Sequence, residues 1–209
     1  MNRAARVTTR KEEPKLWQEF KRQSIQAAVV RLMCREGLGA VTMERVAQEV
    51  GIAKGTVYLH YRDKQELLES VKESSLDPLT LKVEQVFSSA LAPRRKLETF
   101  ALRYLTYFDE NRDLFRILLY EREVTRAQGS RYRHDRYRRL VDSIAAVIGE
   151  GIDDGAFRDV PARKAAAMLL ESVVAIVNQR LLADEADPVE DDARLVADIF
   201  LRGLEAKKK

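Results

Sequence analysis

The chain of 209 residues is 45% apolar and 33% charged, with nine Gly, five Pro and one Cys. This length is enough for one or two domains with full cores, and so few helix breakers favour an all-α fold over a sandwich or a barrel. One cysteine excludes a disulfide framework. The basic, polar start does not resemble a secretory signal, and we find no apolar run that approaches a membrane span. We therefore expect a soluble, cytoplasmic protein without membrane contacts.

The net charge of +4 is unevenly distributed. Residues 1–62 carry a net charge of +6, whereas the remainder carries −2. A phosphate-binding head followed by a partner-binding body would show this division, but so would chance clustering of charges on solvated faces. Charge alone leaves both interpretations open.

The first part of the chain predicts a basic tail over 1–14 and then four helices. A helical stripe predicts the first helix from Leu16 to Glu36, and its members are Ile25, Ala28, Val29, Leu32 and Met33. Thr42 is placed as the N-cap of a short helix that ends at Gly51. A further short helix follows over 54–60. Asp63 and Glu66 have the spacing of a capping box that begins a helix at 64–74.

Two short helices joined by a tight turn that contains Gly are typical of a helix-turn-helix. Ala47 is small where the two helices cross, Gly51 suits a positive φ in the turn, and Val57 is apolar where the second helix packs back. The exposed face of the second helix then mixes cations, hydroxyl groups and an imidazole, which suits an anionic duplex: Lys54, Gly55, Thr56, Tyr58, His60 and Tyr61, with Lys64 just after.

The rest of the chain predicts longer helices separated at its prolines, with no repeat and no strand-period segment. Segments at helical spacing cover 79–91, 94–108, 111–119, 136–149, 163–183 and 190–204. Asp187 and Glu190 form a second capping box, with Pro188 as the first helical residue of the last segment. The fold class is therefore all-α, a three-helix helix-turn-helix head on a C-terminal bundle, with about nine helices in all.

The head closely resembles the TetR family of transcriptional regulators. The resemblance rests on Ile25-x-Ala27-Ala28, on Val46-Ala47-x-x-Val50-Gly51-Ile52-Ala53-Lys54-Gly55-Thr56-Val57-Tyr58, and on His60-Tyr61-x-x-Lys64-Gln65-Glu66-Leu67-Leu68. A looser likeness follows at Gly151-Ile152-x-x-Gly155-x-Phe157-Arg158. Ala53 and Leu59 depart from the family pattern, where Ser and an aromatic or His are frequent.

The resemblance implies DNA contacts from Thr42, Lys54, Gly55, Thr56, Tyr58, His60 and Lys64. Lys54, Gly55 and Thr56 are expected in the major groove, and Tyr58, His60 and Lys64 at phosphates. Thr42 is either an N-cap alone or also a phosphate contact, and Tyr58 could instead face the core. Lys54 has no evident structural role.

One helix-turn-helix covers about half a turn of groove, so a homodimer is expected on a palindromic operator. Helix 163–183 is apolar nearly all round and, with the stripe of 190–204, can form a four-helix interface. The interface candidates are Val173, Val177, Val196, Ile199 and Phe200. The alternative is that both are core helices of one subunit.

Aromatic residues in the middle helices and two polar residues on helix 163–183 are candidates for a small-molecule effector pocket: Tyr104, Phe108, Phe115, Glu171 and Asn178. The alternative is that they belong to the core. The expected domains are therefore a tail (1–14), a DNA-binding domain (15–62), a linking helix (63–76), an effector-binding and dimerisation domain (77–205) and a basic tail (206–209).

The resemblance implies a ligand-responsive DNA-binding regulator, most often a repressor, that an unidentified small-molecule effector releases from its operator. An all-α enzyme is the first alternative, but nucleophile–base pairs, metal-ligand spacings and phosphate loops are absent from the sequence, and we expect no cofactor and no metal. The second alternative is an RNA-binding or scaffold protein that uses the basic–aromatic run at 131–139, which also suits a solvated face or an anion-recognising part of the effector domain.

Overall fold

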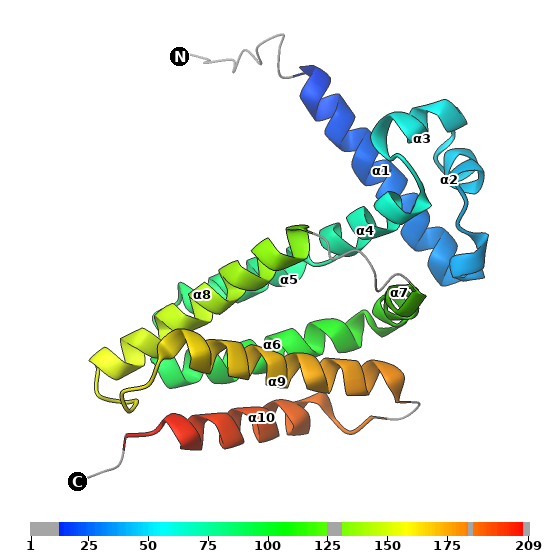
Figure 1. Cartoon of the computed structure of the whole chain (residues 1–209). Coiled ribbons are helices and arrows are strands. Elements are labelled where there is room, and N and C mark those ends of the chain that lie inside the picture. The colour runs from blue at the N-terminus through cyan, green and yellow to red at the C-terminus, as the bar shows by residue number, and fades with distance from the viewer. Residues whose placement is uncertain (1–12, 125–130, 184–185, 207–209) are drawn as a thin grey trace, which may run out of the picture. The chain divides into compact units, whose positions relative to one another are not determined.

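Helices form almost all of the chain that the structure describes, as the scarcity of Gly and Pro predicts. The computed structural model describes residues 13–124, 131–183 and 186–206 (Figure 1). These ranges contain ten α-helices, one short 3-10 helix, no strand, and an isolated antiparallel bridge between Phe157 and Glu205. The predicted all-α fold with an N-terminal helix-turn-helix head is confirmed. The expected tails lie mostly outside the described residues, at 1–12 and 207–209.

The chain divides into two units, Met1–Ser74 and Ser75–Lys209. The N-terminal unit contains α1 (Glu13–Glu36), η1 (Leu38–Ala40), α2 (Met43–Val50), α3 (Lys54–His60) and α4 (Lys64–Ser74). The C-terminal unit contains α5 (Asp77–Phe87), α6 (Pro93–Glu110), α7 (Arg112–Val124), α8 (Arg131–Asp153), α9 (Ala162–Leu182) and α10 (Val189–Leu204). Since α4 packs against α1, the helix expected as a link is part of the N-terminal unit.

The core of the N-terminal unit forms around the apolar stripe of α1. All five predicted members of this stripe are buried, at 0–1% exposure: Ile25, Ala28, Val29, Leu32 and Met33. α2 and α4 pack against α1, and α3 packs against α2. α3 is therefore supported on its inner face by a fully formed core, which positions its outer face.

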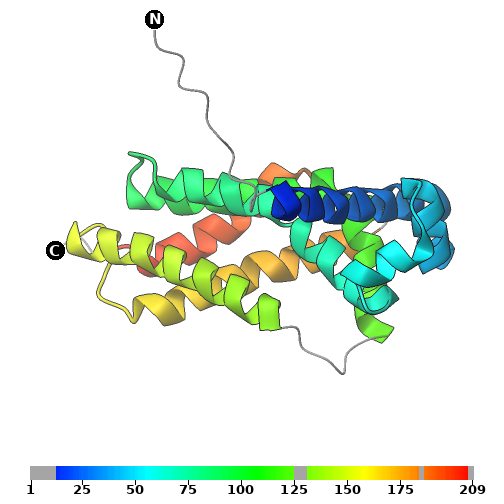
Figure 2. The same ribbon diagram turned by 90° about the horizontal axis from the view of Figure 1, so that it is seen from above.

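α9 lies at the centre of the C-terminal unit and packs against α6, α7, α8 and α10 (Figure 1, Figure 2). Leu169, Leu170 and Val173 are at most 1% exposed. By length and composition alone α9 could cross a membrane, so the expectation that no segment approaches this length is wrong. The core helix of a soluble bundle can have the same composition. The four neighbours of α9 bury 44% of this apolar window and leave Met168 and Leu182 exposed.

A buried arginine that the sequence analysis did not single out joins three helices of the C-terminal unit. Arg180 of α9 is 8% exposed. Its guanidinium lies 2.7 Å from the Asp109 carboxylate of α6 and 2.5 Å from the Asp192 carboxylate of α10. It also donates to the Asp187 carbonyl at 2.8 Å. The fork of donors on one guanidinium therefore fixes α6, α9 and the start of α10 together.

Residues 151–158 close the bundle at the end of α8. A Cβ atom on Gly151 would lie 2.2 Å from the Phe157 ring, so only glycine lets this ring pack against the helix. Phe157 is 3% exposed. The next residue, Arg158, donates its backbone N–H to the Leu204 carbonyl at 2.8 Å and its side chain to the Gly203 carbonyl at 2.6 Å. The segment thus satisfies carbonyl groups at the end of α10.

The predicted start of the last helix is wrong by one residue. Pro188 is the N-cap of α10 rather than its first helical residue, and no side chain caps the helix. Asp187 contributes its carbonyl to Arg180 instead of capping. Three acidic residues in the first turn stabilise the helix N-terminus through its dipole: Glu190, Asp191 and Asp192.

We expect Arg180→Met to lower the stability of the C-terminal unit by about 3 kcal/mol, because it leaves Asp109 and Asp192 without their shared cation. The melting temperature should fall by on the order of 10 °C. Thermal denaturation followed by circular dichroism measures this change. Arg194→Met, at an exposed ion pair with Asp191, is the matched control and should melt like the wild type. Equal melting of the two variants would show that Arg180 does not hold the helices together.

Candidate functional site

The helix-turn-helix is built by one side-chain cap and one left-handed glycine. Thr42 Oγ1 accepts a hydrogen bond from the Arg45 N–H at 3.1 Å, which confirms Thr42 as the N-cap of α2. Gly51 ends α2 with φ 76°, a conformation that a side chain disfavours. Ala47 is 3% exposed and Val57 is fully buried. The predicted packing of this motif is confirmed.

The outer face of α3 is exposed, as predicted, over most of its length. Lys54, Gly55, Tyr58 and Leu59 are exposed, while Thr56 is half-buried. Tyr58 is 46% exposed, so the alternative that it faces the core is excluded. Leu59, at 85%, is a large apolar side chain in water beside the predicted polar contacts.

Lys54 has a structural partner, contrary to expectation. Its ammonium forms an ion pair with the Glu44 carboxylate of α2 and lies 5.7 Å from the centre of the Tyr58 ring. The hydrogen bond to Lys54 lowers the pKa of Glu44, and the same bond raises the pKa of Lys54. Both side chains are about half exposed. Glu44 thus holds the lysine at the N-terminus of α3 and places a negative charge on the same face.

Tyr61 is not part of the exposed face, and this prediction is wrong. The residue follows the last turn of α3 and is 1% exposed. Its hydroxyl has no hydrogen-bond partner among the described residues, and the Arg22 guanidinium of α1 lies 5.4 Å from its ring centre. Tyr61 therefore closes the core beneath α3 instead of contacting a partner.

The end of α3 is close to α1 and to the start of α4. Burial lowers the pKa of His60, and the positive charges of Arg22 and Lys21 lower it further. Lys64 Nζ donates to the Leu38 carbonyl at 3.2 Å. Asp63 accepts from the Glu66 N–H at 2.8 Å, as in the predicted capping box, but the Glu66 carboxylate accepts from the Arg62 N–H. These bonds fix the turn that presents His60 and Lys64.

The three aromatic residues among the five predicted effector residues belong to a packed aromatic cluster. Tyr104 and Phe115 are buried, and neighbouring ring centres lie 4.4–6.1 Å apart in a cluster with Phe87, Phe100, Tyr107 and Phe108. Burial and the charge of Glu171 raise the pKa of Tyr104. The space beside Phe108 has no volume that a water molecule could occupy. Glu171 is exposed and Asn178 half-buried, so the two do not form a buried polar pair.

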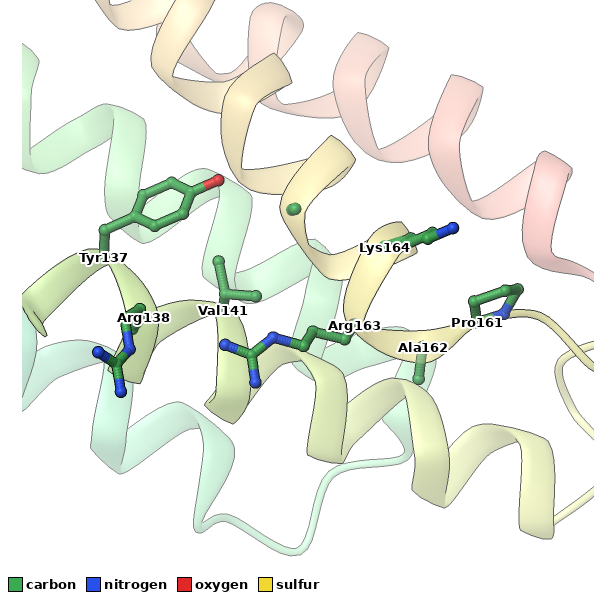
Figure 3. A pocket seen from close by; sticks show the side chains of 8 residues that line it. Tyr137, Arg138, Val141, Pro161, Ala162, Arg163 and Lys164 are labelled. Atoms are coloured by element: carbon green, nitrogen blue, oxygen red, sulfur yellow. The ribbon is translucent and has the colours of Figure 1, made fainter. Parts of the chain in front are cut away.

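An open hollow of about 560 Å³ lies between α8 and the start of α9 instead (Figure 3). Figure 3 shows Tyr137, Arg138 and Val141 on α8, opposite the first turn of α9. Arg163 from that turn forms an ion pair with Asp142 at 2.9 Å. Burial raises the pKa of Tyr137, as does its hydrogen bond to Glu171. None of the five predicted effector residues lines this hollow.

The run at 131–139 is divided among several roles. Arg136 forms an ion pair with Asp77 at 2.8 Å and donates to Thr80 Oγ1 at 2.7 Å, which ties α8 to α5. Tyr137 and Arg138 line the hollow. The side chains of 131–134 lie outside the described residues. Since Arg136 serves the fold, the run is not a uniform binding face.

Most of the predicted dimer residues are interior. Val173, Val177 and Val196 are at most 7% exposed, so these three predictions are wrong and the residues belong to the core of one subunit. Ile199 is 67% exposed and Phe200 half-buried. The apolar residues that α9 and α10 do expose are Met168, Leu182, Leu195 and Ile199, at 53–67%. The sequence pattern did not separate the inner from the outer face of α9, because the outer face also carries large apolar residues, Met168 and Leu182, among exposed polar ones such as Glu171 and Gln179.

The geometry of α2, α3 and their turn defines a DNA-binding helix-turn-helix protein. Two family models match the chain: "Bacterial regulatory proteins, tetR family" over residues 25–71 and "Tetracyclin repressor-like, C-terminal domain" over 90–178. The chain belongs to the TetR family of transcriptional regulators. Proteins of this family are regulators rather than enzymes.

The relatives agree with this assignment. An uncharacterized HTH-type transcriptional regulator of Haemophilus influenzae is 47% identical over 47 residues, which is 22% of this chain and 25% of that protein. The HTH-type transcriptional repressor KstR2 of Mycolicibacterium smegmatis is 26% identical over 147 residues, 66% of this chain and 68% of the repressor. The crystal structure of a TetR-family regulator of Pectobacterium atrosepticum shares the fold, with a TM-score of 0.77 and 18% sequence identity. The match covers 96% of this chain and 100% of that protein.

Lys54→Ala should weaken binding to duplex DNA by about tenfold, because it removes a cation from the N-terminal end of α3, which the sequence predicts to face the bases. Glu44→Gln should instead strengthen binding, because it removes the repulsion between Glu44 and phosphate and releases Lys54 from its pair. Fluorescence anisotropy with a labelled duplex at several salt concentrations measures both effects. Unchanged affinity in both variants would contradict the placement of DNA on this face.

Proposed function

We propose that the chain is a ligand-responsive repressor that binds a palindromic operator as a homodimer in the cytoplasm. The observation that carries the proposal is the exposed outer face of α3, which offers Lys54 and Tyr58 on a helix fixed by a buried inner face. The similarity to the repressor KstR2 over 147 residues supports repression rather than activation of transcription.

On the operator, we assign Lys54, Gly55 and Thr56 to the major groove. Gly55 is exposed and no atom lies within 4 Å of the position that a Cβ would take, so the backbone can approach the duplex closely. Tyr58, His60 and Lys64 are assigned to phosphates, together with Thr42. Lys64 already donates one hydrogen bond to the Leu38 carbonyl, and its ammonium has two further N–H donors for phosphate oxygens.

The dimer is proposed to form through the outer faces of α9 and α10. Met168 and Leu182 lie on the exposed face of α9, and Leu195 and Ile199 lie one turn apart on α10. Burial of four large apolar side chains per subunit is a sufficient reason for association across a two-fold axis. Ile199 and Phe200 are retained from the original candidates.

Ile199→Glu should convert the dimer into a monomer, because a charge would be buried at the centre of the proposed interface. Sedimentation velocity measures the mass, and operator binding should be lost with the dimer. Leu81→Glu is the matched control, since Leu81 is 60% exposed on α5, outside the proposed interface. A dimer that survives Ile199→Glu, or one that Leu81→Glu disrupts, would place the interface elsewhere.

Release by an effector requires coupling between the two units. Only Ser75 and Leu76 separate the end of α4 from the start of α5 along the chain. We propose that effector binding in the C-terminal unit changes the spacing of the two heads and thereby weakens operator binding. The coupling is reciprocal, so bound operator must weaken effector binding by the same factor.

The hollow between α8 and α9 is the proposed effector site in place of the aromatic core. Val141 and Ala167 provide apolar wall, and three cations line the hollow: Arg138, Arg163 and Lys164. Arg138 forms an ion pair with Asp135 and Arg163 one with Asp142, and an effector carboxylate would compete with these partners. The first N–H groups of α9 have no side-chain cap and add to the attraction for anions. The class of effector that fits is a small carboxylate with an apolar body.

Octanoate should raise the melting temperature of the wild type more than octanamide does, because only the carboxylate pairs with the arginines. Arg163→Glu should remove this difference, while Lys82→Glu, at an exposed position on α5, should preserve it. Differential scanning fluorimetry over a concentration series provides the measurement. An equal response of the wild type to both compounds would exclude the hollow as a carboxylate site.

A further inference from the structure

The N-terminal part of α1 presents a pair of exposed aromatic side chains that the fold does not use. Trp17 and Phe20 are each 59% exposed. Their rings are stacked, with centres 5.8 Å apart and planes 13° from parallel. Large apolar side chains in water carry no benefit for the stability of this unit, which makes the pair a candidate for contact with a partner.

Helical register shows why the pair is exposed. Trp17, Lys21 and Ile25 are four residues apart and share one face of α1. Ile25 is fully buried, and from there the stripe of the core begins. Lys21 and Trp17 continue the same stripe one and two turns beyond the core, where no element of the described N-terminal unit covers Trp17. α1 therefore projects past the head that it supports.

The projecting turns carry positive charge beside the recognition helix α3. Lys21 Nζ lies 5.3 Å from the Trp17 ring centre, and the Arg22 guanidinium lies over Tyr61, the residue that follows α3. The charges of both residues act on His60 in the last turn of α3. Lys21 thus lies beside the Trp17 ring, and both cations lie close enough to the end of α3 to act on His60, so the aromatic pair and the end of α3 adjoin the same two cations.

We propose that Trp17, Phe20, Lys21 and Arg22 form a second DNA-contacting surface, the α1 flank, which binds the duplex immediately outside the segment contacted by α3. The proposal rests on the proposed operator binding by α3. Lys21 and Arg22 bind phosphates, and the aromatic pair packs against deoxyribose at the edge of the minor groove, where other proteins insert apolar side chains.

Charge and continuity favour DNA over a protein as the occupant. The exposed stretch from Trp17 to Arg22 carries two cations and one carboxylate, Glu19, which accepts a hydrogen bond from Gln23. The surface therefore keeps a net positive charge, and it adjoins a helix whose own candidate contacts are with DNA. Trp17 precedes Lys21 by four residues, about 6 Å along the helix, a length comparable with the spacing of roughly two phosphates of one strand.

Trp17 is the single tryptophan of the chain, so its emission reports on the α1 flank alone. The full chain first selects duplexes of 40 base pairs from a random-sequence pool, and the selected duplex is then shortened from both ends. We expect the long duplex to change the emission of Trp17, and the shortest duplex that still binds to leave the emission unchanged. The long duplex should also bind more tightly than the short one.

Substitutions then assign the affinity to named side chains. Phe20→Ala and Lys21→Ala should each weaken binding of the long duplex by about fivefold and leave binding of the short duplex unchanged. Lys21→Ala should also reduce the salt slope by about 2 for a dimer, one phosphate per subunit. Arg31→Ala is the matched control, since Arg31 is an exposed cation of the same helix about 15 Å from Lys21. All three variants should melt like the wild type, because these side chains are outside the core.

The outcomes separate this inference from the proposed function. Suppose that Lys54→Ala weakens binding of the selected duplex, while the duplex leaves Trp17 emission unchanged and Phe20→Ala and Lys21→Ala bind like the wild type. Operator binding by α3 would then stand, and the α1 flank would be overturned. A change of Trp17 emission with protein concentration in the absence of DNA would identify the pair as a self-association surface and overturn the inference as well. Failure of the full chain to select any duplex would remove both proposals.

Discussion

The function of this protein depends on the burial of Val57 against α2. Val57 has no exposed surface and Ala47 nearly none, so α3 has only one orientation that buries its apolar inner face against α2. That orientation directs Lys54 and Tyr58 outward. The left-handed turn at Gly51 gives the chain the change of direction that this packing needs. Without this apolar contact, the same polar residues would have no common direction and could not contact one groove of DNA.

Local signals in the sequence predict most of the head, whereas tertiary contacts determine what they miss. The stripe of α1, the Thr42 cap and the turn at Gly51 depend on residues a few positions apart, and all are confirmed. Tyr61 and Glu44 could not be assigned in this way. Tyr61 is buried in the tertiary structure, with Arg22 of α1 over its ring, and the role of Glu44 depends on Lys54 ten residues later.

In the C-terminal unit, the helices are predictable but their faces are not. α9 has apolar residues on its outer as well as its inner side, so spacing alone assigned Val173 and Val177 to an interface although they are interior. Arg180 shows the converse difficulty, since a lone arginine near the end of an apolar helix gives no sign of partners on α6 and α10. The hollow depends on the angle between two helices, which no pattern in the sequence encodes.

Two arginines hold α10 in place, one at each end of the helix. Arg180 secures its first turn through Asp192, and Arg158 secures its last turn through the carbonyls of Gly203 and Leu204. Contacts at both ends of α10 oppose rotation of the helix about its own axis, so Leu195 and Ile199 keep their outward direction. If two subunits associate through this side of α10, the interface keeps its geometry when a ligand binds. The rearrangement would then take place in helices that are not held at both ends.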